Sequence, residues 1–199
     1  MDEPIDRTTA LVIASDSGDF DGPKYLAMHR GRPLLQRVLD DVAAWPVDGV
    51  VVVLGDEAER VLAAIDFDEA MVVIDPEWRE GAAASIRVGL DSLAREHLSG
   101  SCLLARGDQV GVPPELVARL LATHRRREAM ATVPKYRYAR GWPIVVSERL
   151  WPRLMGLEGD VDVLDVLSSH PGGVAEEWFD TLPPHLISSA DDLPDGRRR

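Results

Sequence analysis

Short runs of apolar, mostly β-branched residues alternate along the chain with segments in which apolar side chains recur every three or four positions. The first pattern is typical of buried strands, and the second is typical of helices with one buried face. Up to residue 127 the two patterns take turns regularly. This part of the chain predicts strands over residues 10–14, 49–55, 70–74 and 101–105, and helices over residues 33–45, 58–65, 81–98 and 113–127.

The alternation becomes less regular after residue 129. Strands are expected there over residues 130–138, 143–146 and 174–179, and helices over residues 148–155 and 161–169. Strands that take turns with helices build a sheet covered by helices on both faces. We therefore expect an α/β fold of three layers, α/β/α, around a mostly parallel mixed sheet. The length fits one domain over residues 9–194, between disordered ends at residues 1–8 and 195–199.

Charge and composition narrow the classes of function. The formal net charge is −12, whereas proteins that bind nucleic acids or anionic membranes collect Lys and Arg on one face. Neither nucleic acid nor a membrane is therefore expected as a partner. The single cysteine, Cys102, lies in an apolar run, which predicts a core residue in a reducing compartment. No apolar stretch reaches the ~20 residues of a membrane-spanning helix, and the first residues lack the features of a signal peptide. We expect a cytoplasmic protein.

In sheets of this class, ligands bind outside the carboxyl ends of the strands, so the loops that follow the strands are the places to search for chemistry. The loop after the first predicted strand, residues 15–24, contains glycines, hydroxyl groups and the terminal Lys24. Small residues let backbone N–H groups approach an anion, and a lysine adds a positive charge near phosphate oxygens. The loop matches neither GxGxxG nor a P-loop. A phosphate-binding loop and an ordinary acidic surface turn are both compatible with it.

Two later loops are also informative. Asp108 follows the fourth predicted strand, where a carboxylate can hold Mg²⁺ against the phosphates of a nucleotide. Gly-Asp at the end of a strand is also a common turn. Ser85 lies at the start of a predicted helix, where it could face a ribose or a base, or could serve only as a cap. Motifs of serine hydrolases, zinc proteases and redox CxxC proteins are absent from the sequence, and its five histidines have no metal-binding spacing.

Six motifs follow one another in a characteristic order. They are VIASDSGDFDGPK at residues 12–24, similar to LAAGxSxRMGxPK; GRPLL at 31–35; PEW with Gly81 and SIRVGL at 76–90, similar to NPxWxxGxxxSLxxGL; GDQ at 107–109; PKY with GWP at 134–143, similar to PxYxGxxGHPV; and LEGD at 157–160, similar to LxGDxGAR. In this order they resemble the MobA-like NTP transferases, in particular the molybdenum cofactor cytidylyltransferase branch, over residues 11–193. The resemblance implies a Rossmann-like nucleotide-diphospho-sugar transferase fold.

The resemblance also implies a reaction. An anionic oxygen of a phosphorylated acceptor, such as molybdopterin, attacks the α-phosphorus of an NTP, with CTP or GTP as the expected donor, and pyrophosphate leaves with Mg²⁺ neutralising charge. Lys24 and Asp108 would be the catalytic residues. The nucleotide would be held by Ala14, Ser15, Ser17, Lys24, Gly81 and Ser85, the metal by Asp108 and Asp160, and the acceptor by Tyr136, Gly141, Trp142 and Asp160.

The chain departs from the family pattern at several positions. Ser15, Asp19 and Asp21 stand where the family has glycine, arginine and glycine, and Trp142 stands where it has histidine. Near the end, Ser188 falls in the segment where the family usually has aspartates near the metal. The extra carboxylates would repel a triphosphate unless they point to water or bind a metal ion. A homologue that binds a nucleotide or a pterin without turnover therefore stays open as an alternative, as do a monomer and a homodimer.

Overall fold

A mixed sheet of eight strands forms the middle layer of the molecule. The computed structural model describes residues 7–96, 100–169 and 172–194, and the expected disordered ends fall largely on residues 1–6 and 195–199, outside the described residues. The strands follow the order β11-β8-β10-β6-β1-β4-β5, and β9 pairs with β8. Their bounds are β1 Thr8–Ala14, β4 Gly49–Leu54, β5 Met71–Ile74, β6 Ser101–Arg106, β8 Ala131–Tyr136, β9 Ala139–Arg140, β10 Ile144–Ser147 and β11 Val174–Phe179.

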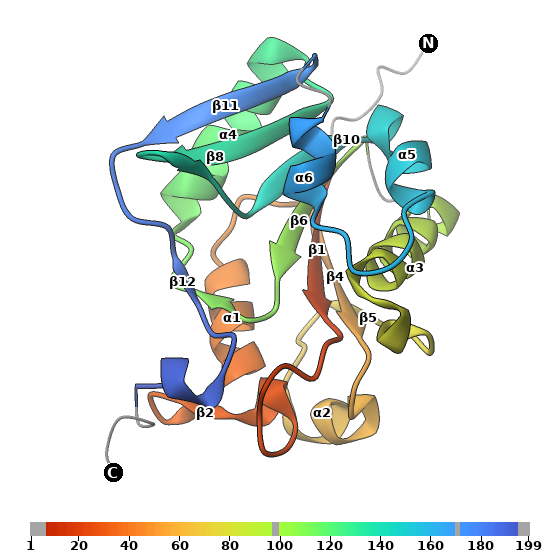
Figure 1. The fold of residues 1–199 in the computed structure, drawn as a ribbon, viewed down its shortest axis with the longest axis vertical. Helices are drawn as coiled ribbons and strands as arrows, with labels where there is room; N and C mark the ends of the chain where they lie inside the picture. Colours follow the sequence, from red (N-terminus) through yellow and green to blue (C-terminus); the bar gives the residue numbers. More distant parts are fainter. Residues whose placement is uncertain (1–6, 97–99, 170–171, 195–199) are drawn as a thin grey trace.

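Helices cover both faces of this sheet (Figure 1). Buried side chains of three helices pack against one face, namely α1 Leu34–Val42, α2 Ala58–Ala64 and α4 Pro114–Arg127. The other face is packed by α3 Ala82–Arg95, α5 Trp151–Met155 and α6 Val163–Ser168. The predicted three-layer α/β/α fold with a mostly parallel mixed sheet is therefore confirmed.

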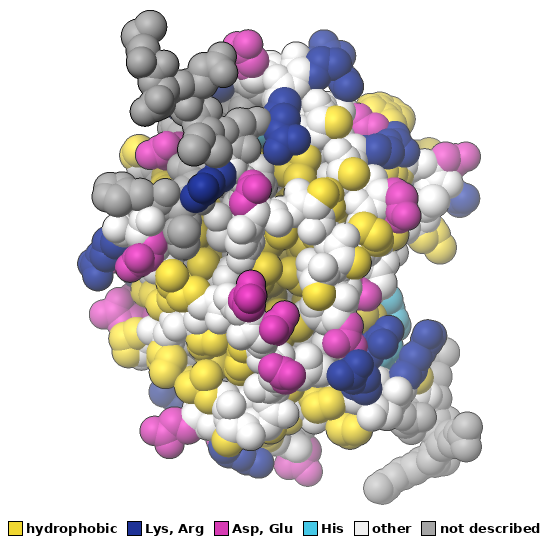
Figure 2. Space-filling model, turned by 180° about the vertical axis from the view of Figure 1, so that it is seen from behind, with side chains coloured by type: hydrophobic (Ala, Val, Ile, Leu, Met, Phe, Trp, Pro, Cys, Tyr) yellow, Lys and Arg dark blue, Asp and Glu magenta, His cyan; other side chains and the backbone are white. Residues whose placement is uncertain are grey.

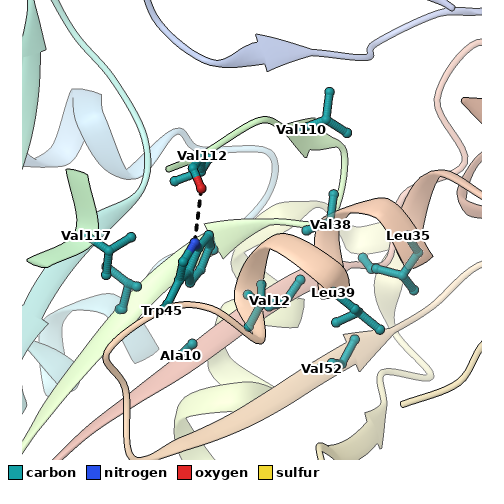
Figure 3. Packing of buried hydrophobic residues seen from close by; sticks show 14 of the residues in the cluster. Ala10, Val12, Leu35, Val38, Leu39, Trp45, Val52, Val110, Val112 and Val117 are labelled. Carbon is teal, nitrogen blue, oxygen red and sulfur yellow. Dashed lines mark hydrogen bonds between the residues drawn. The ribbon is translucent and has the colours of Figure 1, made fainter. Parts of the chain in front are cut away.

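The central strand β1 explains how the sequence produces two cores. Ala10, Val12 and Ala14 belong to the apolar cluster on one face, and Leu11 belongs to the cluster on the other, as the two-residue period of a strand requires. Figure 3 shows the first cluster, where the Trp45 indole nitrogen donates a hydrogen bond of 3.1 Å to the backbone oxygen of Val112. Such a bond satisfies the one polar group that a buried tryptophan brings into the core.

Strand direction determines which loops meet at one edge. β1 pairs in parallel with β4 and β6, and β4 pairs in parallel with β5, so these four strands end at the same edge. β10 runs antiparallel to β6, so it begins where they end. The carboxyl ends of the parallel strands therefore share their edge with the segment that precedes β10.

Several short elements were not predicted. β2 Met28–His29 and β3 Arg32–Pro33 form a small hairpin, and β7 Gln109–Val110 pairs with β12 His185–Leu186. The predicted helix over residues 148–155 is a 3₁₀ turn, η3 Glu148–Leu150, followed by α5. Further 3₁₀ turns are η1 Lys24–Leu26, η2 Trp78–Glu80 and η4 Ala190–Asp192. Two-residue strands carry no periodic signal, because a period of two needs several residues to be visible.

None of the helices in the described part of the chain is both long and apolar enough to cross a membrane.

Candidate active site

A cleft of about 840 Å³ opens at the edge where β1, β5 and β6 end and where β10 begins. Its walls come from segments that lie far apart in the sequence, which the parallel strands bring to one edge. They are Ile13 and residues 15–17 after β1, residues 78–82 and Ile86 around the start of α3, Arg106 and Asp108 after β6, Trp142 before β10, and residues 160–163 before α6. The location is the one where α/β sheets bind ligands.

A cluster of buried charges forms the base of the cleft. The ammonium nitrogen of Lys24 donates one hydrogen bond of 2.6 Å to Asp16 Oδ2 and another of 2.6 Å to Asp108 Oδ2. Arg106 adds bonds of 3.1 and 3.3 Å from its guanidinium to the Asp108 carboxylate. Lys24 and Asp108 are each only 2% exposed, whereas the side chain of Asp16 is 56% exposed. Each buried charge thus has an opposite charge in contact.

The same cluster shifts several pKa values. Burial pushes the pKa of Asp16 upward, but the positive charge of Lys24 and hydrogen bonds from Lys24 and Tyr25 outweigh it and lower the pKa. The phenol of Tyr25 donates to Asp16. Burial and the adjacent carboxylates raise the pKa of Tyr25 well above its ordinary value. Burial lowers the pKa of Arg106, but the hydrogen bond and charge of Asp108 raise it overall. At neutral pH the cluster therefore holds charged Asp16 and Arg106 beside a neutral Tyr25.

A chain of two serines and one aspartate lies beneath the wall of the cleft. Asp75 is fully buried, and its Oδ1 accepts a bond of 2.8 Å from the backbone N–H of Glu77. The Ser85 hydroxyl lies 2.6 Å from Asp75 Oδ2 and 2.7 Å from the Ser15 hydroxyl. Ser85 is the donor in both contacts and has one proton, which it shares between the Asp75 carboxylate and the Ser15 hydroxyl oxygen. These contacts link the loop after β1 to the loop after β5 beneath the cleft wall.

Gly81 brings Asp160 next to the start of α3. The backbone of Gly81 has φ +107°, and a Cβ atom there would lie 2.6–2.7 Å from the backbone of Gly159 and Asp160. The Ala83 N–H donates a bond of 3.3 Å to the Gly159 carbonyl. The absence of a side chain at Gly81 thus allows residues 159–160 to pass close to the helix, and it places the exposed Asp160 on the cleft wall.

The residues expected to hold the acceptor form one unit around Trp142. The Tyr136 hydroxyl donates a bond of 2.9 Å to the backbone oxygen of Trp142. Gly141 packs against the Tyr136 ring, whose nearest carbon would lie 2.8 Å from a Cβ at that glycine. Trp142 lines the cleft, while Tyr136 and Gly141 lie behind it and support its backbone.

The sequence-predicted site residues divide into two groups. Ser15, Ser17, Gly81, Asp108, Trp142 and Asp160 line the cleft, whereas Ala14, Lys24, Ser85, Tyr136 and Gly141 lie behind its wall. Ser85 bonds Asp75 and Ser15, and Lys24 bonds Asp16 and Asp108, so these two are tied to the wall. Ala14 is 1% exposed and packs in the core. Asp19 and Asp21 are exposed and do not line the cleft.

Sequence reasoning missed several residues of the site. Asp16 and Arg106 contact the predicted pair Lys24 and Asp108, and Asp75 contacts Ser85. Arg79 lines the cleft and stacks 4.3 Å above the Trp78 ring. A usable signal existed, because each of these residues lies in a loop that follows a predicted strand. The sequence contained no indication of which charged residues of a loop turn inward.

The described side chains do not form a metal site by themselves. Within residues 7–96, 100–169 and 172–194, no three His, Cys, Asp or Glu side chains gather closely enough to hold a metal ion. Asp16, Asp108, Asp160 and Asp162 nevertheless supply carboxylates to one cleft. Mg²⁺ binds through one or two carboxylates together with water and substrate phosphates, so this set of oxygen donors fits a metal ion that a nucleotide shares.

The family model of the MobA-like NTP transferase domain matches residues 10–174 of the chain. The chain belongs to this family. Its sequence is 29% identical over 178 residues to nicotine blue oxidoreductase of Paenarthrobacter nicotinovorans, covering 85% of this chain and 86% of that protein. It is 29% identical over 131 residues to the bifunctional protein GlmU of Bifidobacterium adolescentis, covering 63% of this chain and 28% of that protein.

Solved structures with a similar fold include members from mycobacteria and from an archaeon. A homologue of Rv0371c from Mycobacterium sp. strain JC1 has a TM-score of 0.84 and 28% identity, over 94% of this MobA-like chain and 92% of that one. A manganese complex of Rv0371C from Mycobacterium tuberculosis has a TM-score of 0.82 and 26% identity, covering 94% of this chain and 95% of that one. Molybdopterin-guanine dinucleotide biosynthesis protein A from Archaeoglobus fulgidus has a TM-score of 0.67 and 22% identity, covering 95% of this chain and 96% of that one. The chain has the Rossmann-like α/β fold of the nucleotidyltransferases.

Proposed function

We propose that the chain transfers a nucleoside monophosphate from an NTP, with CTP or GTP as the donor, to a phosphorylated acceptor such as molybdopterin. An anionic acceptor oxygen forms a bond to the α-phosphorus, the bond from that phosphorus to the bridging oxygen breaks, and pyrophosphate leaves. The observation that supports this most is that Asp108 and Arg106 line the cleft together, with Lys24 bonded to Asp108 directly behind its wall. Such a transfer depends on positioning and on neutralised charge.

Positive charges are available for the triphosphate. Lys24 is shared between Asp16 and Asp108, and Asp16 is the more exposed of these two partners. Incoming phosphate oxygens would replace Asp16 as the partner of Lys24, because a lysine ammonium has three donors and can keep its bond to Asp108. Arg79 and Arg106 line the same cleft and offer guanidinium groups that suit phosphate oxygens.

Asp108 and Asp160 are the residues that we propose to hold Mg²⁺, with Asp16 and Asp162 in the same cleft wall to bind waters of the metal. When bound, the metal supplies positive charge to the phosphates and to the leaving pyrophosphate. The manganese complex of the Rv0371C structure is consistent with a divalent metal in this family.

Pyrophosphate release tests the proposal. The purified chain is supplied with each NTP, MgCl₂ and molybdopterin, and pyrophosphate is measured by a coupled assay. We expect release with CTP or GTP, and a loss of at least about 100-fold in kcat/KM in both Lys24→Gln and Asp108→Asn, which remove groups that meet the developing charge. Lys135→Gln is the matched control, because Lys135 is the only other lysine in the chain and pairs with Glu176.

Two results would contradict the proposed function. Release that persists in Lys24→Gln, or that falls equally in Lys135→Gln, would contradict the assigned role of Lys24. An absence of NTP binding by calorimetry at millimolar concentration, with and without Mg²⁺, would remove the nucleotide from the proposal altogether.

A second candidate is a homologue that binds a nucleotide or a pterin without transferring anything. It is favoured by the ion pairs that occupy Lys24 on two sides, and by Asp19 at the position where the family has an arginine. The relative from Paenarthrobacter nicotinovorans, which matches most of the chain, is named an oxidoreductase. Binding of an NTP or a pterin without pyrophosphate release would favour this candidate.

A further inference from the structure

A second cavity, of about 280 Å³, lies away from the cleft. Six described residues line it, and none of them lines the cleft: His29, Arg30, Arg37, Val110, Gly111 and His185. Four of the six carry side chains that are cationic or can become so. These four come from the β2–β3 hairpin, from α1 and from β12, which lie together at the lower left of the molecule in Figure 1. With the end of β7, four separate segments of the chain therefore build one basic cavity.

The backbone holds these side chains in place. His29 ends β2 and is 4% exposed, so its ring is part of the cavity wall. Arg30 follows in the turn of the hairpin with φ +50°. His185 is paired with Val110 through the β7–β12 ladder, and Arg37 reaches the cavity from the middle of α1. The cavity is thus part of the folded framework.

The charge of the cavity is opposite to that of the whole chain. No Asp or Glu is among its described lining residues, although the formal net charge of the chain is −12. Three carboxylates lie beside the lining and already have hydrogen-bond partners. Asp40 Oδ2 bonds Arg32 at 2.7 Å, and Asp41 Oδ2 accepts the N–H of Gly111, a lining residue, at 2.7 Å. Asp192 accepts the N–H groups of Ser188 and Ser189 at 2.9 Å, and its charge also acts on His185. In Figure 2, dark blue and cyan side chains gather at the lower right, with magenta side chains next to them.

Arg37 has a donor without an acceptor. Its Nε is buried and makes no hydrogen bond to any described residue, and its Nη1 lies 3.9 Å from Asp40 Oδ2, beyond hydrogen-bond distance. A buried donor that lacks a partner is unfavourable, so such groups are rare unless a ligand or water completes them. The missing acceptor at Arg37 and the lack of acidic residues in the described lining both indicate a ligand rich in oxygen and negative charge.

We propose that this cavity binds a phosphate group, through Arg30 and Arg37 with His29 and His185. The planar guanidinium donors suit the tetrahedral oxyanion, and imidazole N–H groups add further donors. The cavity is larger than the phosphate ion itself, so it has room for the small organic part of a phosphomonoester. The site is independent of the proposed nucleotidyl transfer, because it shares no described residue with the cleft.

Residue-resolved NMR tests the proposal with inorganic phosphate as the probe. Backbone amide spectra of the ¹⁵N-labelled chain are recorded while phosphate is added at constant ionic strength. We expect saturable shifts at Arg30, Gly111 and Leu186, and at least roughly tenfold weaker binding in Arg37→Gln, because hydrogen bonds to charged groups are among the stronger ones. Arg60→Gln is the matched control. It removes the same charge from α2, where Arg60 is exposed and pairs with Glu57.

Other outcomes decide against the site. Shifts confined to residues 15–24 would place the phosphate in the cleft, and an equal loss in Arg60→Gln would indicate a general charge effect. Either result, or the absence of saturable shifts, overturns the proposal. If Arg37→Gln does not fold, Arg30→Gln in the exposed turn is the second variant with the same expected loss. A parallel titration with glycerol 3-phosphate shows which kind of ligand carries the phosphate group. Tighter binding than that of inorganic phosphate indicates a phosphorylated metabolite, and weaker binding indicates the free phosphate ion.

Discussion

Lys24 connects the loop after β1 to the charged base of the cleft. It is buried between two carboxylates, and Asp108, the more buried of them, has Lys24 and the partly exposed Arg106 as its charged partners among the described residues. A buried ion pair adds little net stability compared with an apolar pair, but removal of one member leaves the other charge uncompensated. The stability of the loop at residues 15–24 is therefore coupled to the protein core through this side chain.

Lys24→Gln is expected to lower the free energy of unfolding by about 3–5 kcal/mol, because it leaves the carboxylate of Asp108 buried without its main partner. Urea denaturation followed by circular dichroism measures the loss. In the double variant Lys24→Gln with Asp108→Asn, the loss should be smaller than the sum of the two single losses. Strict additivity would mean that the two side chains do not act as a pair.

At the residue scale, the sequence indicated which residues belong to the candidate site better than it indicated which partners they contact. Lys24, Asp108 and Ser85 could be singled out because each follows a strand and has a suitable functional group. The partners Asp16, Arg106 and Asp75 lie in the same loops, but the inward or outward direction of a loop side chain depends on tertiary packing. Asp16 points to Lys24 whereas Asp19 is exposed to solvent, and no local pattern distinguishes the two.

At the scale of elements, β11 is attached to α4 by a partly buried carboxylate. Glu177 accepts hydrogen bonds of 3.0 Å from Arg119 Nε and 2.6 Å from the Thr123 hydroxyl. Burial raises the pKa of Glu177, but these bonds and the positive charge of Arg119 outweigh it and lower the pKa below its ordinary value. A depressed pKa means that the ionised form stabilises the fold at neutral pH. This contribution decreases as the pH falls below about 4.3, the ordinary pKa of a glutamate. It is lost once the pH has fallen through the lowered pKa of Glu177.

Glu177→Gln is expected to reduce stability at pH 7 by about 1.5–3 kcal/mol, the range for hydrogen bonds to charged groups. Between about pH 6 and pH 3 it should also lose less stability than the parent chain. Denaturant unfolding at several pH values measures both effects. Glu57→Gln serves as the control, because Glu57 forms an exposed pair with Arg60 and should change stability by less than about 0.5 kcal/mol. Parallel stability–pH curves for Glu177→Gln and the parent would contradict the assigned pKa shift.

Gly81 joins two elements of the cleft, because α3 and the segment before α6 touch there. Gly81→Ala is expected to destabilise the chain and to displace Asp160, since a Cβ would lie 2.6 Å from the Gly159 backbone. Gly22→Ala is a close control: Gly22 has φ +109° against +107° for Gly81, but open space surrounds its Cβ position. Both variants carry the strain of a positive φ, roughly 1 kcal/mol or more.

Thermal unfolding and the amide shifts of residues 159–162 compare the two glycine variants. A greater loss of stability in Gly81→Ala than in Gly22→Ala, with shifts at Asp160, is the expected result. Equal losses in the two variants would mean that backbone strain alone matters and that the close approach of Gly159 has no consequence.

The longer elements could be predicted from sequence because their patterns repeat often enough to be seen. α1, α3, α4 and the strands of the sheet other than the two-residue β9 match predicted segments, with differences of a few residues at their ends. The β7–β12 pairing joins residues more than seventy positions apart. Its formation depends on where the rest of the chain places the two strands, so local periodicity contains no information about it.

At the scale of the whole molecule, Cys102 reports on the integrity of the sheet. It lies in β6 between β1 and β10 and is fully buried, and burial raises the pKa of its thiol. The native chain should therefore not react with Ellman's reagent at about pH 8 over hours, while the chain in guanidinium chloride should release one equivalent of chromophore at once. Rapid reaction of the native chain would show that the sheet opens locally at β6.

The order of the strands has a consequence for how the chain folds during synthesis. β1 is made first, and its partner β4 follows within about forty residues, but Ser101, the partner of Thr8 on the other side, is made more than ninety residues after it. Until then, one edge of this largely buried strand exposes its N–H and C=O groups together with apolar side chains, a state prone to aggregation. A ribosome-bound chain that stops before residue 101 should therefore require chaperones, and release of that requirement should coincide with the emergence of β6.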